Sequence, residues 1–281
     1  MLSFDLMKSI KREGLVDLVA SLCIKANLVL PKYQKEKLEW ALENETSPLG
    51  KKLISQIIEN YKIAEKTGLA ICQDCGLAVV FLEAGRDVHL DFDIYEAINE
   101  GVAKGYSEGH LRPSVLHSCV DRTNTKTNTP AIIHTQIIDG DKIKLTVAPK
   151  GGGSENASRL AMLKPYEGWQ GIVDFVVKTV RENGPSACPP VTVGIGLGGT
   201  MEECALLAKK ALLADNQSEE LGDMEKEILE LCNNLGFGPA GLGGKISVLD
   251  VHMLSTGCHI ATMPVAVNIQ CHAARKATGE M

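Results

Sequence analysis

The chain has 281 residues, of which 29 are Lys or Arg and 35 are Asp or Glu, and its formal net charge is −6. This length allows one large domain or two small ones with a substantial core. The charges form neither a basic stripe nor an acidic block, no apolar run reaches membrane-spanning length, and the first residues lack a secretory pattern. We therefore expect a cytoplasmic protein without nucleic-acid or membrane partners.

The first hundred residues are expected to be mainly helical. Apolar residues recur at three- and four-residue spacing over residues 15–28, 34–43, 53–66 and 94–107. Prolines separate the first three of these segments and favour breaks there. Asp93, and Thr46 or Ser47, are expected to cap the helices that follow them.

The middle of the chain is expected to hold a long loop followed by two strands. Residues 111–130 are too polar for a core and too long for an idle turn, so a functional role is favoured. Residues 131–138 and 142–148 then alternate as strands do, on either side of an Asp-Gly-Asp turn signal at 139–141. This pattern predicts a β-hairpin.

The second half alternates between helical and strand patterns. Helices are expected near residues 157–163, 169–182, 201–213 and 219–235. Strands are expected at residues 191–197, 246–253 and 259–269, with a glycine-rich segment at 236–244. We therefore expect an α/β fold, in which a helical N-terminal segment (residues 1–70) joins mixed sheets with packed helices in a single compact unit over residues 1–281.

Three of the nine cysteines, Cys72, Cys188 and Cys271, lie at abrupt breaks in the pattern. Such positions suit a thiol that must be aimed at a metal or a substrate, and three thiols leave one corner of a four-cornered metal site open. Gln73 and Asp74 follow the first thiol, and an amide and a carboxylate there could bind substrate and move a proton. By spacing alone, the CxxC at 72–75 is also compatible with a redox pair, half a zinc site or a turn with incidental thiols.

Two further elements are candidates for binding an anion. Gly151, Gly152 and Gly153 precede a predicted helix, where backbone N–H groups attract negative charge; a plain tight turn is the alternative. Arg112 could clamp a carboxylate with its planar guanidinium, although an exposed loop arginine is the commoner explanation.

A glycine cluster at residues 194–199 formally matches the dinucleotide fingerprint G-x-G-x-x-G, which would indicate a nicotinamide-dependent oxidoreductase. Residues 215–220, however, are polar and helix-linking and do not resemble the end of a second strand bearing a ribose-binding acid. The alternative is that these glycines allow tight packing of a strand against the next helix, with Thr200 capping that helix.

Several motifs together resemble the α subunit of the iron–sulfur-dependent class I fumarate hydratases, with the L-tartrate dehydratase α subunit second. The motifs are CQDCG at 72–76, KGGGSEN at 150–156, ACPP at 187–190, GGT at 198–200, GLGGK at 241–245 and CHAAR at 271–275. They occur in order from about residue 46 to residue 275. The resemblance implies a [4Fe–4S] cluster held by Cys72, Cys188 and Cys271, with one iron open as a Lewis acid toward malate.

The same resemblance implies the reversible hydration of fumarate to (S)-malate. It also implies that a small dicarboxylate substrate is bound by a set of side chains and a glycine loop: Gln73, Asp74, Arg112, Gly151, Gly152 and Gly153. Asp74 is also implied as a proton-transfer candidate. A non-catalytic, regulatory iron–sulfur protein remains the other hypothesis.

The chain departs from the family pattern in two respects. Cys75 stands where the motif usually has Thr, and this fourth thiol could tune the cluster, ligate the open iron in a resting form, or be a tolerated replacement of similar size. Single-chain members also carry a further C-terminal domain with more substrate-binding arginines and the catalytic base. The resemblance implies that a separate β subunit supplies it in a heterotetramer, so we expect this chain alone to be nearly inactive.

Overall fold

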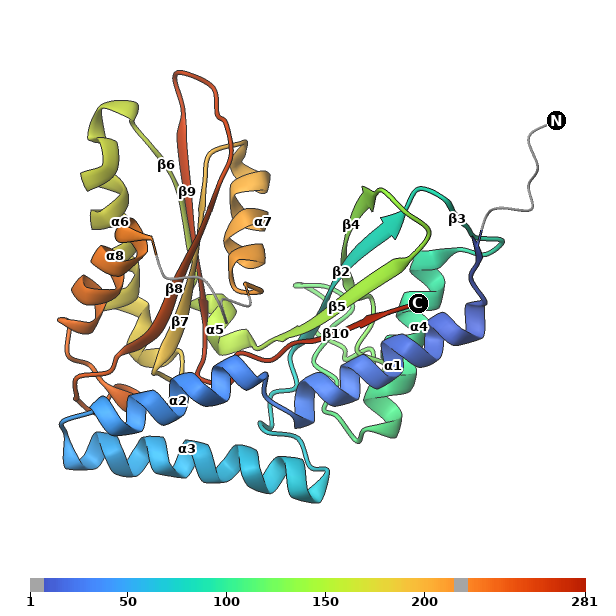
Figure 1. Cartoon of the computed structure of the whole chain (residues 1–281), viewed down its shortest axis with the longest axis horizontal. Coiled ribbons are helices and arrows are strands. Elements are labelled where there is room, and N and C mark those ends of the chain that lie inside the picture. Colours follow the sequence, from blue (N-terminus) through green and yellow to red (C-terminus); the bar gives the residue numbers. More distant parts are fainter. Residues whose placement is uncertain (1–7, 215–221) are drawn as a thin grey trace. The chain divides into compact units, whose positions relative to one another are not determined.

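The computed structural model describes residues 8–214 and 222–281 of a mixed α/β protein (Figure 1), which confirms the predicted fold class. We expected a single compact unit, and the contacts divide the chain into two compact units. The first comprises Met1–Leu30, Ile63–Gly151 and Arg275–Met281, and the second comprises Pro31–Lys62 and Gly152–Ala274. The helices expected within residues 1–70 are present, but they are shared between the two units instead of forming a lobe of their own.

In the first unit, helices α1 (Arg12–Leu28) and α4 (Ile94–Glu108) pack together against a four-stranded sheet. The strand order is β10 (Ala277–Glu280), β5 (Ile143–Lys150), β2 (Leu77–Gly85) and β4 (Ile132–Ile138). A separate parallel pair joins β1 (Lys8–Ser9) to β3 (Val88–His89). Asp93 caps α4 as predicted, because its Oδ1 accepts the N–H groups of Tyr95 and Glu96.

The predicted hairpin is wrong, although both of its strands exist. Strand β2 lies between β4 and β5, and it pairs in parallel with β4 and antiparallel with β5. The physical reason is the apolar run of β2, which is buried almost throughout and takes the central position. The Asp-Gly-Asp turn therefore crosses the end of β2, where an added Cβ on Gly85 would lie 2.4 Å from the carbonyl oxygen of Gly140.

In the second unit, a four-stranded sheet lies between α7 on one face and α6 and α8 on the other (Figure 1). The strand order is β6 (Arg159–Leu163), β9 (Met263–Gln270), β7 (Val191–Leu197) and β8 (Val248–Ser255). The covering helices are α6 (Gly168–Asn183), α7 (Met201–Ala211) and α8 (Asp223–Asn233). Helix α2 (Lys32–Asn44) also packs on β8, where Lys37 pairs with the buried Asp250 at 3.0 Å. Helix α3 (Pro48–Thr67) begins in this unit, and the Oγ of Ser47 caps it by accepting Gly50 N–H.

One helix prediction in this region needs correction. Residues 157–163 were expected to be helical, but the helix here is the short α5 (Gly152–Asn156), and Arg159–Leu163 is the edge strand β6. Pairing with β9 outweighs the helical pattern of this short segment. The helix expected at 219–235 is α8, and residues 219–221 of that prediction lie outside the described residues.

Within the glycine cluster at 194–199, Gly194 and Gly196 serve strand–helix packing. An added Cβ would lie 2.2 Å from the Ala208 carbonyl oxygen at Gly194 and 2.1 Å from the Cys204 carbonyl oxygen at Gly196. Only glycine lets α7 approach β7 this closely. Thr200 precedes α7, but its hydroxyl donates to Glu202 and makes no capping bond, so that detail of the prediction is wrong.

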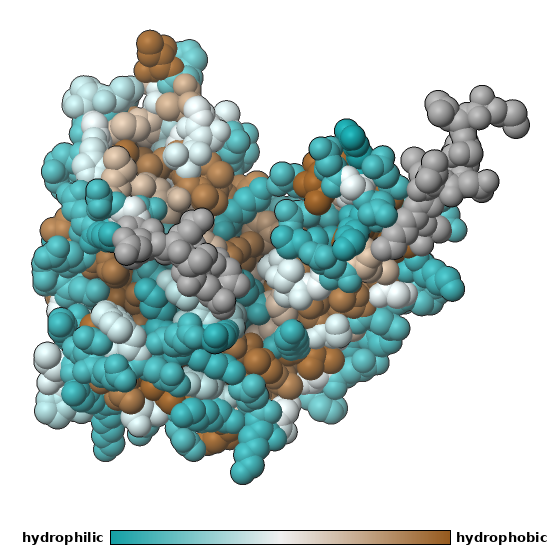
Figure 2. Space-filling model, viewed as in Figure 1, coloured by the Kyte–Doolittle hydropathy of each residue, from teal (hydrophilic) through white to brown (hydrophobic). Residues whose placement is uncertain are grey.

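One apolar stretch within residues 8–214 and 222–281, Arg12–Asn44, has the length and composition of a membrane span, and half of its most apolar window is buried inside the protein. The apolar side of α1 lies in the first core, where Leu15, Val19 and Cys23 are fully buried. On the face drawn in Figure 2, hydrophobic and hydrophilic residues alternate over the surface.

Candidate functional site

The CQDCG motif forms a tight turn in the first unit. Asp74 donates its backbone N–H to the sulfur of Cys72 at 3.4 Å, and its Oδ1 accepts the N–H of Gly76 at 2.9 Å. Cys72 and Asp74 are half-buried, while Gln73 is exposed. The turn therefore keeps a thiol, an amide and a carboxylate together, with the thiol already accepting a hydrogen bond of the kind that stabilises a thiolate ligand.

A buried polar network holds this turn from behind. Tyr106 on α4 donates its hydroxyl to the carbonyl oxygens of Cys75 (2.8 Å) and Gly76 (3.0 Å). Asn128, which is fully buried, donates to the Gly76 carbonyl at 3.1 Å and accepts the Ser114 N–H at 2.6 Å. The long loop 111–130 is thus fastened to the turn, which supports the functional role expected of that loop.

Arg275 of the CHAAR motif supports the same turn from another side. It is 3% exposed, and its Nη2 donates to the Asp74 carbonyl at 2.8 Å while its Nη1 donates to Asn27 Oδ1 at 2.9 Å. The carbonyl of Asn27 in turn accepts the N–H of Ile71 at 2.9 Å. Two motifs 200 residues apart in the sequence therefore build one turn.

Arg112 lies in the loop that this network fastens. Its backbone N–H donates to the sulfur of Cys75 at 3.2 Å, so the backbone at Arg112 is tied to the CQDCG turn. Its side chain is exposed, and within the described parts of the chain no ion pair involves its guanidinium. An exposed guanidinium on a backbone tied to the CQDCG turn suits a carboxylate ligand.

Cys188 and Cys271 lie together in the second unit. The carbonyl oxygen of Cys188 accepts the His272 N–H at 3.2 Å and lies 3.0 Å from His272 Nδ1, so the two cysteine loops are joined by their backbones. Gln34 on α2 adds a bond from Nε2 to the His272 carbonyl at 2.7 Å. Cys188 is exposed and has a φ of 55°, a backbone conformation that side-chain-bearing residues adopt mainly at sites where the surroundings require it.

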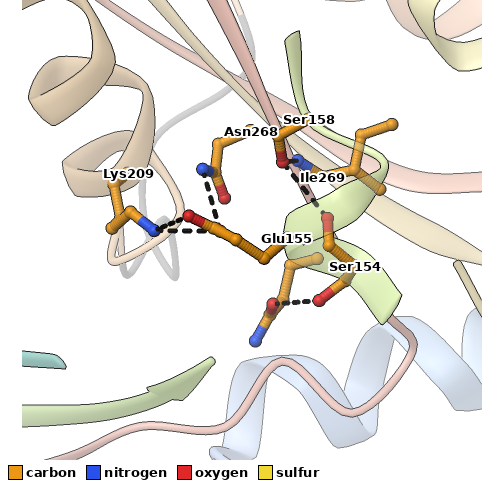
Figure 3. Close-up of polar contacts among 7 residues, drawn as sticks. Ser154, Glu155, Ser158, Lys209, Asn268 and Ile269 are labelled. Atoms are coloured by element: carbon orange, nitrogen blue, oxygen red, sulfur yellow. Dashed lines mark hydrogen bonds and ion pairs between the residues drawn. The ribbon is translucent and has the colours of Figure 1, made fainter. Parts of the chain in front are cut away.

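The glycine loop is divided between the units: Gly151 belongs to the first, and Gly152 and Gly153 begin α5 in the second. Figure 3 shows how α5 is fixed to its own unit. Glu155 pairs with Lys209 of α7 at 2.8 Å and lies 3.5 Å from Asn268 Nδ2, while Ser158 Oγ accepts the Ile269 N–H at 3.0 Å. The exposed backbone of the two later glycines is therefore presented from a firmly held helix.

The GLGGK motif is held by a buried carboxylate that sequence analysis did not single out. Glu45 is 1% exposed, and its Oε1 accepts the N–H groups of Thr46 (2.7 Å), Ser47 (2.8 Å) and Lys245 (2.9 Å). Its Oε2 accepts the N–H of Ile246 at 2.8 Å. Burial acts to raise the pKa of Glu45, but these four backbone bonds outweigh it, so the pKa lies below its usual value.

We expect Glu45→Gln to destabilise the second unit by about 2–3 kcal/mol near neutral pH, because the amide nitrogen would face backbone N–H donors. Folding lowers the pKa of Glu45. The contribution of this carboxylate to the free energy of unfolding is therefore complete above the unfolded-state pKa and is lost as the pH falls through the folded-state pKa. The stability difference between wild type and variant should therefore shrink as the solution is acidified below about pH 4.5. Urea denaturation across this range measures it, and a difference that grows on acidification would contradict the assignment.

The predicted cysteine trio is thus drawn from both units, with Cys72 in the first and Cys188 and Cys271 in the second. Across residues 8–214 and 222–281, no three His, Cys, Asp or Glu side chains form a ready-made metal-binding group. The donor chemistry nevertheless fits a cluster: the three thiols lie outside helices and strands, are at least partly accessible, and form no disulfide.

The other cysteines divide as expected between core and loop. Cys23, Cys204 and Cys232 are fully buried, and burial raises the pKa of Cys23 and Cys232 to about 12 and that of Cys204 to about 11. Such thiols stay protonated and act as small apolar residues. Cys119 and Cys258 are exposed.

Comparison with known proteins places these motifs in a family. The family described as fumarate hydratase (Fumerase) matches residues 16–280. A protein from Methanocaldococcus jannaschii, provisionally named an L(+)-tartrate dehydratase subunit alpha, is 43% identical over 272 residues that cover 93% of this chain and 95% of its own. The L(+)-tartrate dehydratase subunit alpha of Escherichia coli strain K12 is 30% identical over 272 residues, covering 94% of this chain and 89% of its own. The chain is of the hydro-lyase class. It belongs to the fumarate hydratase family.

Proposed function

We propose that this chain is the α subunit of a two-chain, oxygen-sensitive hydro-lyase that removes water from, and adds it to, a four-carbon dicarboxylate. The observation that carries the proposal is the CQDCG turn, where the Cys72 thiol, the Gln73 amide and the Asp74 carboxylate are held together by Tyr106 and Arg275. Family membership over nearly the whole chain supports the reaction class.

The proposed cofactor is a [4Fe–4S] cluster with Cys72, Cys188 and Cys271 as its ligands. When bound, it supplies a Lewis acid that makes a substrate hydroxyl a better leaving group. The trio's loop positions and accessibility support this assignment.

The chain's own residues bind and orient the dicarboxylate in this proposal. The exposed guanidinium of Arg112 pairs with one substrate carboxylate, and the backbone N–H groups of Gly151, Gly152 and Gly153 and the Gln73 amide bind other substrate oxygens. The Asp74 carboxylate accepts or donates the proton that accompanies loss or addition of water.

Fumarate and (S)-malate are the substrate pair we propose first, because the family model describes fumarate hydratase and residues 154–156 after the glycines resemble the fumarase sequence. L-Tartrate is the second candidate, since both relatives are named as L(+)-tartrate dehydratase subunits.

The names of these relatives as alpha subunits support a β-subunit partner, and we propose a heterotetramer of two α and two β chains. A reducing cytoplasm, with no nucleic-acid or membrane partner, is the proposed setting.

The deciding experiment is an anaerobic assay of the reconstituted αβ complex with malate, fumarate and L-tartrate. We expect turnover of one of these substrates that is lost on exposure to air, and only slight turnover by the α chain alone. The β chain should come from the same organism as this chain, and the β chain alone is the matched control. A complex that contains the cluster but converts none of the three substrates would contradict the proposed function.

A further inference from the structure

Cys75 is the one thiol of the CQDCG turn that the proposed function leaves without a role. It is 2% exposed and packs in the apolar core of the first unit, together with Ala78 on β2 and Tyr106 on α4. Its sulfur accepts the backbone N–H of Arg112 at 3.2 Å and lies 3.7 Å from the Cys72 carbonyl, to which the thiol donates.

We propose that Cys75 is a positioning residue whose buried sulfur fastens the backbone of Arg112 to the turn that carries Cys72, Gln73 and Asp74. Cys75 and Arg112 are 37 residues apart in the sequence, so the contact fixes the start of a long loop relative to the turn. Loops of this length are otherwise among the more mobile parts of a protein. The inference rests on the proposed function only in taking Arg112 to bind a substrate carboxylate.

The surroundings of Cys75 favour this role over that of a cluster ligand. Both hydrogen-bonding capacities of the thiol, one donor and one acceptor, are already used within the turn and the Arg112 loop. Next along the loop, the Ser114 N–H is held by Asn128. The loop is therefore fastened at Arg112 by the sulfur and at Ser114 by an amide, and the exposed guanidinium of Arg112 projects from a fixed backbone.

A hydroxyl of similar size could make the same two bonds, whereas an apolar side chain could not. Cys75→Thr should therefore preserve the link, and Cys75→Ala should remove it. Cys23→Ala is the matched control, because Cys23 is a fully buried thiol of the same core and the hydrogen bonds of the turn described above do not involve its sulfur. If Cys75→Ala does not fold, Cys75→Val fills the space without offering a hydrogen-bond partner.

The first measurement is amide hydrogen exchange of the full-length α chain, without cluster or β subunit. Because Pro113 has no amide hydrogen, the difference between fragments that start at the same earlier residue and end at Leu111 or at Pro113 reports the Arg112 N–H alone. We expect exchange at Arg112 to be about fivefold to tenfold faster in Cys75→Ala, as loss of a hydrogen bond of about 1 kcal/mol implies, and close to wild type in Cys75→Thr and Cys23→Ala.

The second measurement is steady-state kinetics of the αβ complex with the substrate it prefers. We expect Cys75→Ala to raise KM several-fold with a smaller change in kcat and with cluster absorbance retained, and Cys75→Thr to restore KM. Unchanged exchange at Arg112 in Cys75→Ala, or an equal increase in Cys23→Ala, would overturn the proposal. Loss of cluster absorbance with unchanged Arg112 exchange would also overturn it, in favour of a ligand role. An inactive wild-type complex would refute the proposed function and leave the exchange result to decide the role of Cys75.

Discussion

Replacing Cys188 with Ser is expected to abolish the iron–sulfur chromophore of the anaerobically reconstituted protein and to reduce hydro-lyase activity of the αβ complex below detection. A hydroxyl is a much poorer ligand for iron than a thiolate, and a cluster with only two remaining cysteine ligands should not be retained. Cys188 is exposed, so the substitution should change the free energy of unfolding by no more than about 0.5 kcal/mol.

The control for this experiment is Cys119→Ser, which replaces another exposed loop thiol that the proposed site does not use. It should keep both the broad visible absorbance and the activity. Absorbance is measured before and after exposure to air, together with iron and sulfide content and a thermal unfolding curve for each variant. A Cys188→Ser protein that retains a full cluster, or a wild-type protein that is colourless and binds stoichiometric zinc, would contradict the ligand assignment.

The sequence predicted the elements better than it predicted their partners. Helices α1, α4, α6 and α7 follow directly from three- and four-residue spacing, because that spacing describes one face of a helix without reference to the rest of the chain. The pairing of β4 and β5 with β2 could not be predicted from the sequence. A turn signal at 139–141 specifies that the chain reverses, but it does not specify which strand lies alongside. Helix prediction at 157–163 failed for the same reason, since pairing with β9 decides the outcome.

The candidate site shows the same division between local and distant information. Cys72, Cys188 and Cys271 could be singled out because they interrupt a pattern, which is a local signal. Groups that hold the motifs could not be singled out. Asn128, which fastens the CQDCG turn, stands in a polar loop, and Glu45, which holds the GLGGK motif, ends an ordinary helical segment. Their roles arise from hydrogen bonds to backbone groups far away in the sequence. A single sequence considered by itself contains no signal of such contacts.

Gly76→Ala is expected to destabilise the first unit by about 3 kcal/mol and to displace the CQDCG turn. Gly76 has a φ of 71°, a conformation that costs a residue with a Cβ about 1–2 kcal/mol. The added Cβ would also lie 2.7–2.8 Å from the backbone N, C and O atoms of Lys150 on β5. These backbone atoms belong to a paired strand and cannot move aside, so overpacking should add about 1–3 kcal/mol.

Gly68→Ala separates the two contributions, because Gly68 lies in the same unit with a φ of 72° and has no atom within 4 Å of an added Cβ. It should cost only the backbone term of about 1–2 kcal/mol. Urea denaturation of the α chain measures both variants, and exchange of the Asp74 amide, which donates to the Cys72 sulfur, reports the turn itself. Because the Gly76 carbonyl accepts bonds from the side chains of Tyr106 and Asn128, its displacement should also loosen Asp74 two residues earlier. Equal destabilisation by the two substitutions would mean that the close approach to Lys150 is not what requires glycine in this motif, and that the turn does not depend on β5 for its position.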